Sequence, residues 1–244
     1  MVIWQKYDRK SKVVWTPDGQ MPDIEPYTKI KHELLESYLC DWVETIVGNR
    51  FYTPNPKVTI VDGFSGGGIY KDGEGTWEGS PIRIIRAIEK GWEIVKERKP
   101  YQSLDIAYLF VDRRPEHIQC LENQIRKHGY GHLLNDGTCV TRIGHFEDHL
   151  GECLQWVKSR GGHSFFFLDP FGSVDLPMMA NAILSLGRSE VLLNHMHNDA
   201  FVRPIVQAFK RGRGSQFLQE YNLEKYYAFC AEYDNLPNLT RQTL

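Results

Sequence analysis

The sequence has few cysteines, no long apolar run and almost no net charge, and each of these features excludes a class of protein. Its 244 residues include five cysteines, and none of them forms a CxxC pair. A disulfide framework and a clustered-cysteine zinc site are therefore not expected, and reduced thiols in a cytoplasmic protein are. No apolar run approaches membrane-spanning length, and the first residues, MVIWQKYDRK, do not resemble a signal peptide. The net charge of −2 excludes a generally basic protein, although a local basic patch could still bind nucleic acid.

From residue 58 onward, short apolar runs alternate with amphipathic segments of helical spacing. The runs are VTIVD (58–62), IAYLFVD (106–112), CVTRI (139–143), SFFFLD (164–169) and EVLLN (190–194). Helices are expected to begin near Ser80-Pro81, Pro115, Phe146 and Pro177. Strands that are apolar on both faces and alternate with helices are typical of a mostly parallel sheet with helices on both sides. The sequence therefore predicts a doubly wound, Rossmann-like α/β fold.

Segments before and after this pattern are expected to extend the core. Residues 1–50 are predicted to form an N-terminal arm and a helix that packs on the core. Thr28 is expected to cap that helix, whose apolar positions are Ile30, Leu34, Leu35, Leu39, Trp42, Val43 and Ile46. Residues 51–200 are the predicted ligand-binding core, and residues 201–244 are a predicted helical C-terminal extension. The antiparallel hairpin that would complete a full sheet is not evident near the end, so either the chain is truncated or the sheet is completed differently.

Polar residues stand where the apolar runs end. Asp62, Asp112, Asp169 and Asn194 each close a predicted strand. In a doubly wound sheet, ligands bind at the carboxyl ends of the strands. Any one of these residues could instead be a helix-capping acid, but four at one edge of the sheet favour a ligand site.

The glycine-rich turn after the first run, DGFSGGG (62–68), distinguishes between three ligand classes. A phosphate-binding P-loop needs a GK[ST] ending that this turn lacks. A dinucleotide fingerprint needs a third glycine where Lys71 stands, and an acid about 20 residues farther on. The turn fits the pattern acid-x-F/G-x-G-x-G, which binds S-adenosyl-L-methionine (SAM).

Each part of SAM has a candidate partner in this sequence. Asp62 is expected to accept a hydrogen bond from the ammonium group, directly or through water, and Asp112 from both ribose hydroxyls. Glycines let the backbone approach the cofactor closely. Phe146 could lie on the adenine or be a core residue, and a carboxylate or amide within residues 144–147 could read the adenine amino group. The predicted cofactor-binding residues are Lys31, Asp62, Gly63, Phe64, Gly66, Gly68, Asp112 and Phe146.

A second informative segment is FFFLDPFG (165–172). It resembles the [D/N]-P-P-[Y/F] element of SAM-dependent amino-methyltransferases, and is similar to the D-P-F-G of enzymes that dimethylate a guanine amine in tRNA. The resemblance implies that Asp169 and Pro170 help to hold the target amine and that Phe171 stacks on the base. Alternatively, the segment is a plain strand-ending turn and Phe171 a packing residue.

Three segments together resemble the three-Cys-motif partner (TcmP) family, which has a class I methyltransferase-like domain. They are IEPYTKIKHELLESYL (24–39), VDGFSGGGIYKDGEGTWEGSP (61–81), and FFFLDPFG with EVLLN. The likeness spans about residues 15–200. The chain departs from that family at Gly67, where Pro or Ala is usual, and at Tyr27, where His is common. The family name implies a genetic partner with three cysteines, which could be a radical-type iron–sulfur protein.

Lys31-His32 also resembles the Lys-His of an rRNA adenine-N6 methyltransferase family, in the segment that covers the cofactor. That resemblance implies that Lys31 meets the SAM carboxylate; otherwise Lys31 is a solvated charge on a helix. In the last third, FKRGRGSQF (209–217) could contact phosphates or be a solvated loop. The histidines of HMH (195–197) lack an evident third ligand, so no metal site is expected.

These observations predict a cytoplasmic SAM-dependent methyltransferase that acts on an amino group, most simply of a nucleobase in RNA or DNA. A target base within a duplex would have to be flipped out of the stack. The alternatives are a non-catalytic or partner-dependent module on a methyltransferase scaffold, acting with a three-Cys-motif protein, and a nicotinamide-dependent oxidoreductase.

Overall fold

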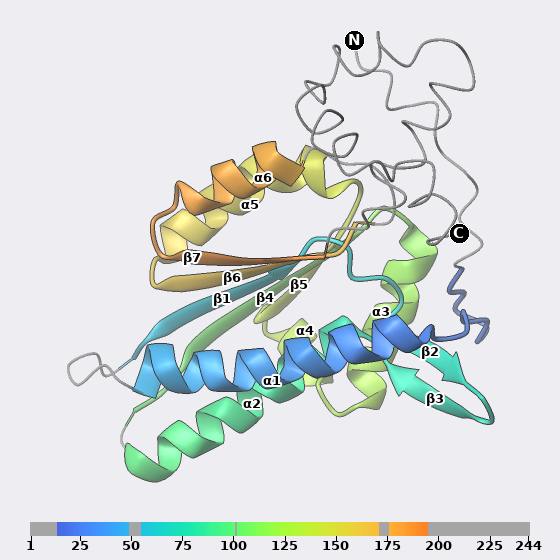
Figure 1. Cartoon of the computed structure of the whole chain (residues 1–244), viewed down its shortest axis with the longest axis horizontal. Helices are drawn as coiled ribbons and strands as arrows, with labels where there is room; N and C mark the ends of the chain where they lie inside the picture. The colour runs from blue at the N-terminus through green and yellow to red at the C-terminus, as the bar shows by residue number, and fades with distance from the viewer. Residues whose placement is uncertain (1–13, 49–54, 101, 171–175, 195–244) are drawn as a thin grey trace, which may run out of the picture. The chain divides into compact units, whose positions relative to one another are not determined.

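The structure, a computed structural model, describes residues 14–48, 55–100, 102–170 and 176–194. Apart from Pro170 and Asn194, these residues belong to one compact unit. Its helices are α1 (Pro26–Gly48), α2 (Ser80–Arg98), α3 (Pro115–Lys127), α4 (Gly131–Asn135), α5 (Phe146–Arg160) and α6 (Leu176–Leu184) (Figure 1). Its strands are β1 (Lys57–Asp62), β2 (Ile69–Asp72), β3 (Gly75–Glu78), β4 (Asp105–Asp112), β5 (Cys139–Ile143), β6 (His163–Leu168) and β7 (Ser189–Leu193). The predicted C-terminal extension, the basic segment 209–217 and the HMH segment lie outside the described residues.

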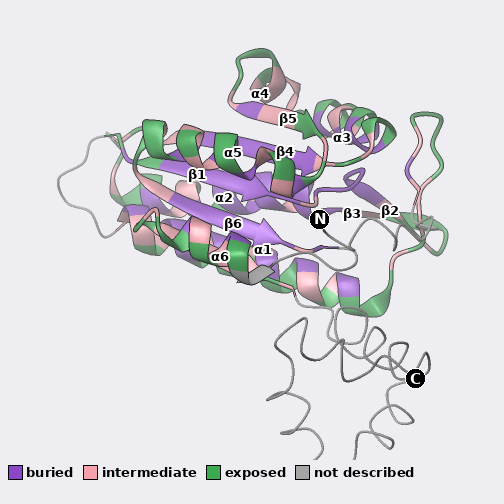
Figure 2. Cartoon of the chain, turned by 90° about the horizontal axis from the view of Figure 1, so that it is seen from above, coloured by how far each residue is buried: buried purple, intermediate pink, exposed green. Residues whose placement is uncertain are grey.

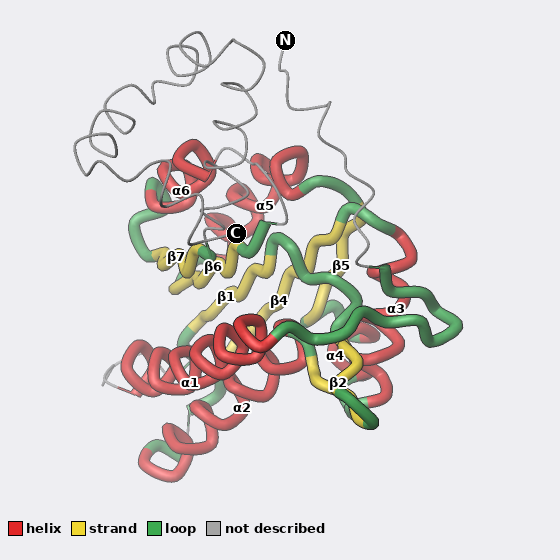
Figure 3. The backbone as a smooth tube through the Cα atoms, turned by 45° about the vertical axis from the view of Figure 1, so that its right-hand side comes forward, coloured by secondary structure: helices red, strands yellow, loops and turns green. Residues whose placement is uncertain are grey.

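Five strands form a parallel sheet in the order β5-β4-β1-β6-β7. The chain runs from β1 outward to β4 and β5, and then returns to the other side of β1 for β6 and β7 (Figure 3). This arrangement confirms the predicted α/β, Rossmann-like fold. The reversal of direction beside β1 is the topological switch point, where such sheets bind their ligands.

Helices cover both faces of the sheet. Helices α1, α2 and α3 lie on one face, and α5 and α6 on the other (Figure 1). Val58 and Ile60 belong to the hydrophobic core of the first face, and Val61, which points the other way, is equally buried. Because both faces are covered, the central strands are almost entirely buried (Figure 2), which explains why their sequences are continuously apolar.

Helix α1 differs from the prediction in its start and in its buried face. It begins at Pro26, so Thr28 is a buried residue of the helix rather than its cap. Ile30 and Leu34 are 59% and 65% exposed. At 100° per residue they lie opposite His32, and the buried face includes Thr28, His32, Leu35, Leu39, Trp42, Val43 and Val47. The apolar pattern therefore predicted the helix correctly but included two residues of its outer face.

A hairpin of β2 and β3 stands between the glycine turn and α2, and the sequence analysis missed it. The two strands pair antiparallel around Gly73-Glu74, and Gly73 has a φ of 57°. A glycine at the first position of a two-residue loop between two short strand-like runs is the signal that could have predicted it. The Gly79 N–H donates to the Gly68 carbonyl at 2.8 Å, so the hairpin returns the chain to the glycine turn. The short helix α4 was also not predicted.

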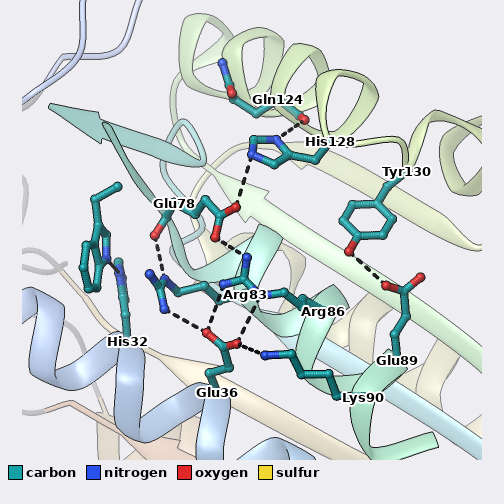
Figure 4. A network of polar contacts seen from close by, with 11 residues as sticks. His32, Glu36, Glu78, Arg83, Arg86, Glu89, Lys90, Gln124, His128 and Tyr130 are labelled. Carbon is teal, nitrogen blue, oxygen red and sulfur yellow. Dashed lines mark hydrogen bonds and ion pairs between the residues drawn. The ribbon is translucent and has the colours of Figure 1, made fainter. Parts of the chain in front are cut away.

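An ion-pair network joins α1 to α2 and to the hairpin (Figure 4). Glu36 of α1 accepts hydrogen bonds from Arg83 at 2.8 Å, from Arg86 at 3.0 Å and from Lys90 at 3.0 Å. Burial favours the neutral form of Glu36, but these cations lower its pKa to about 2. Arg86 also pairs with Glu78 of β3. The network fixes the helix that carries Lys31 and His32 relative to the hairpin.

None of the helices among the described residues is both long enough and apolar enough to cross a membrane.

Candidate functional site

Asp62 ends β1 and is completely buried. One carboxylate oxygen accepts a hydrogen bond from the Phe64 N–H at 3.0 Å, and the other from the Ser80 hydroxyl at 2.7 Å. Burial raises the pKa of this carboxyl to about 7, and the charge of Asp169 adds to the shift, while the two hydrogen bonds and Lys31 oppose it. Asp62 is therefore only partly ionised at neutral pH, and a nearby cation would favour its charged form.

Asp112 ends the neighbouring strand β4 and contacts the same turn. Its Oδ2 accepts from the Gly66 N–H at 3.1 Å, and its Oδ1 accepts from the Arg114 N–H at 2.9 Å. The Nδ1 atom of His117 lies 3.0 Å from Oδ1. A carboxylate has about four acceptor positions, so these three contacts leave capacity for another donor. The acids that were predicted from two separate strands are thus brought together around residues 62–66.

The glycines of the turn lie close to side chains of four other segments. A Cβ atom at Gly63 would stand 2.9 Å from the Phe146 ring, and one at Gly68 would stand 2.8 Å from Leu121. Gly66 and Gly68 have φ angles of 60° and 76°, which other residues rarely adopt. In the structure, side chains of the protein itself lie close to this backbone, and the approach of a cofactor stays a prediction.

Trp15 covers the outer part of the turn. Its ring is 4% exposed and lies against Gly66 and Gly67, and its Nε1 donates to the Ile69 carbonyl. Tyr70 and His117 contact the ring edge-on, with centroids 5.2 and 4.8 Å away. Sequence reasoning did not identify Trp15, because no local pattern indicates where a side chain 50 residues away will pack.

Lys31 and Asp169 form an ion pair at the same edge of the sheet. Asp169 follows the last residue of β6, and Lys31 reaches it from α1. The two side chains are 16% and 20% exposed, so Lys31 is not a solvated helix charge. Pro170 follows and is buried, and Phe171 lies outside the described residues.

Tyr70 of β2 is a member of this group that the sequence analysis missed. Burial raises the pKa of its hydroxyl well above the usual value, and Asp169, Asp62 and Asp112 raise it further. The phenol therefore stays protonated and can donate a hydrogen bond. Tyr70 lies in β2 of the hairpin, which was not predicted because its sequence is rich in glycine.

Phe146 begins α5, just after β5, and is 1% exposed. Its ring packs on Gly63 and contacts Phe64 edge-on, with centroids 6.1 Å apart. Glu147 follows it, and the Oε2 atom of Glu147 is buried without a hydrogen-bond partner among the described residues. A buried, unpaired acceptor is unusual, and it suits a ligand that brings a donor.

The charges at this edge favour a cationic ligand. Three carboxylates, those of Asp62, Asp112 and Asp169, raise the pKa of Tyr70, and Lys31 pairs with Asp169. No group of three or more His, Cys, Asp or Glu side chains among the described residues could hold a metal ion. Comparison with models of protein families and with curated proteins found no match for this chain.

Proposed function

We propose that this protein binds SAM at the carboxyl ends of β1 and β4 and transfers its methyl group to an amino group. One observation carries the proposal: the acids that end these two neighbouring strands both hydrogen-bond to the glycine turn, at the switch point of a parallel sheet. The turn also has the sequence spacing of a SAM-binding turn.

The residues present suit the charge and the hydroxyl groups of SAM. SAM carries a sulfonium and an ammonium group, and the carboxylates of Asp62 and Asp112 would stabilise both. Asp62, which is only partly ionised in the free protein, would gain a cationic partner. Asp112 retains acceptor capacity for a ribose hydroxyl.

Phe146 and Glu147 are the proposed partners of the adenine. Replacing Glu147 with alanine is expected to weaken SAM binding about tenfold, because the adenine amino group would lose its buried hydrogen-bond acceptor. Asp148→Ala, which removes the neighbouring exposed carboxylate, should leave the Kd unchanged. Calorimetric titration of both variants makes the comparison, and equal affinities for the two would exclude Glu147 from the adenine site.

When bound, SAM supplies a methyl group on a positively charged sulfur atom. The carboxylate of Asp169 would accept a hydrogen bond from the target amine and so direct the nitrogen lone pair towards that methyl. On methyl transfer, with the sulfur leaving as a neutral thioether, Asp169 or water would take the proton that the amine releases. Such a site acts mainly by positioning and by exclusion of water. Lys31 would have to share Asp169 with the amine or release it.

The likeness of residues 165–172 to amino-methyltransferase elements favours a nucleobase as the substrate. Transfer of labelled methyl from SAM to fractionated RNA and DNA tests the proposal. Label is expected in one nucleic-acid fraction with the native chain, and none with Asp169→Ala. If no fraction of either nucleic acid is labelled, the proposed reaction is wrong.

The position of Trp15 favours one alternative, a partner-dependent module on a methyltransferase scaffold that acts with a three-Cys-motif protein. In that case Trp15 keeps the turn closed in the isolated chain. Methylation of RNA or DNA by the purified chain alone would exclude this alternative.

A further inference from the structure

We propose that Trp15 is a displaceable cover of the ligand site, and that the nucleoside which replaces it hydrogen-bonds to His117 as well as to Asp112. The inference rests on the proposed function. It adds Trp15, which covers the site in the free chain, and His117, which binds the nucleoside. The ligand chemistry that it requires is a vicinal diol, as in the ribose of SAM.

Gly67 shows that this turn is shaped for the Trp15 ring. Its φ angle lies outside the left-handed region, so the backbone there does not require glycine. A Cβ atom at Gly67 would nevertheless overlap the ring of Trp15, and one at Gly66 would stand 3.0 Å from it. An alanine at position 67 would therefore expel the ring while it leaves the backbone conformation accessible.

The ring occupies the place where a ribose would bind. It touches the glycine turn after β1 and lies edge-on to His117, which lies 3.0 Å from the carboxylate that ends β4. The same carboxylate bonds to Gly66, under the ring. Trp15 thus bridges the two strand ends between which the proposed function places the nucleoside.

His117 is incompletely satisfied while Trp15 is in place. Its side chain is 7% exposed, and its Nε2 atom is buried without a partner among the described residues. Because a carboxylate accepts hydrogen bonds, Nδ1 of His117 is the donor in its contact with Asp112, and in the imidazole tautomer with the proton on Nδ1 the other nitrogen, Nε2, is an acceptor. A ribose hydroxyl could donate to Nε2 while the second hydroxyl donates to Asp112. The indole N–H of Trp15, in contrast, is already bonded to the Ile69 carbonyl and so is not available to Nε2.

A turn separates Trp15 from the place where its segment pairs with β2. Pro22 and Ile24 bond to Lys71 of β2, at 2.8 Å in each case. Between them and Trp15, residues 16–20 form a turn that includes Gly19, with a φ of 102°. Movement at this turn would lift Trp15 while the pairing with β2 is kept.

Two variants test the cover in the full chain by calorimetric titration with SAM. Trp15→Ala removes the ring, and Gly67→Ala expels it without deleting it. Both are expected to bind SAM about tenfold more tightly than the native chain, equivalent to about 1.4 kcal/mol, because binding no longer competes with the docked ring. The matched controls are Gly151→Ala, where nothing lies near the added carbon, and Trp156→Ala on α5, and both should bind like the native chain.

Two further readouts separate the possible failures. In NMR spectra, the Trp15 indole N–H resonance, assigned with Trp15→Phe, should move on addition of SAM as its bond to Ile69 is lost. Adding His117→Phe to Trp15→Ala should cancel the gain in affinity. If the native chain binds SAM with Trp15 unperturbed, or if the two variants bind no more tightly, the cover is wrong and the proposed function stands. If SAM binds to neither the native chain nor Trp15→Ala, both proposals fail.

Discussion

Replacement of Asp169 with alanine is expected to lower kcat for methyl transfer at least about 100-fold and to leave the Kd for SAM within about threefold. The proposed role of Asp169 is to hold the target amine, and a poorly positioned reacting group costs about two orders of magnitude in rate. Asp169 pairs with Lys31, whereas the hydrogen bonds to the glycine turn come from Asp62 and Asp112, so the cofactor contacts should persist. Labelled-methyl transfer and SAM titration measure the two quantities separately.

Asp169→Asn is the matched control, since it keeps an acceptor oxygen and removes the charge. It should retain activity within about tenfold of the native chain if Asp169 acts as a hydrogen-bond acceptor, because positioning is preserved. An asparagine variant as inactive as the alanine variant would instead assign Asp169 as the base. Near-native activity of Asp169→Ala would remove Asp169 from the site.

The second large effect concerns stability in acid and comes from His32. Burial, followed by Lys31 and Arg83, lowers the pKa of His32 to about 3, and its Nδ1 accepts a hydrogen bond from Trp77 at 3.2 Å. Between about pH 6.5 and 3 the unfolded chain binds a proton at this residue and the folded chain does not. The free energy of unfolding therefore falls as the pH falls, by about 1.4 kcal/mol per unit from this group.

Asp62 has the opposite effect over nearly the same range. Its folded pKa of about 7 lies above the unfolded value of 3.8, so the folded chain binds the extra proton and gains stability as the pH falls. The two contributions nearly cancel in the native chain. A difference between variants is thus more informative than the native profile alone.

His32→Gln keeps an acceptor for Trp77 but cannot titrate. The free energy of unfolding of this variant minus that of the native chain is expected to rise by about 3 kcal/mol as the pH falls from 7 to 4. Urea unfolding at several pH values measures it, and exposed His132→Gln is the control. A constant difference between His32→Gln and the native chain across this range would show that His32 does not remain neutral when folded.

The fold could be predicted from the sequence because its central strands are covered on both faces. That burial makes VTIVD and SFFFLD continuously apolar, and the acids that follow them stand out. Helix α1 was harder, since Ile30 and Leu34 are apolar and yet exposed. Apolar spacing alone cannot distinguish one face of such a helix from the other.

The site was predicted in part. The strand-end acids and the glycine turn were identified, because a parallel sheet brings consecutive strand ends to one edge. Ser80, Trp15, Tyr70 and His117 were not, since their roles depend on contacts between segments far apart in the sequence. Lys31 was associated with the cofactor by resemblance, and its pairing with Asp169 could not be derived from the residues alone.

The central claim is that Asp62 provides a negative charge for a bound cation, and calorimetric titration of SAM at pH 6 and pH 8 tests it most directly. Since the pKa of Asp62 is about 7 in the free protein, binding should expel its proton, and the native chain should bind about tenfold more tightly at pH 8. Ionisation of SAM itself affects the affinity of Asp62→Asn in the same way as that of the native chain. The change in SAM affinity of Asp62→Asn between pH 6 and pH 8 should therefore be about tenfold smaller than that of the native chain. Absence of SAM binding at both pH values, or the same pH dependence in the native chain and in Asp62→Asn, would contradict the account.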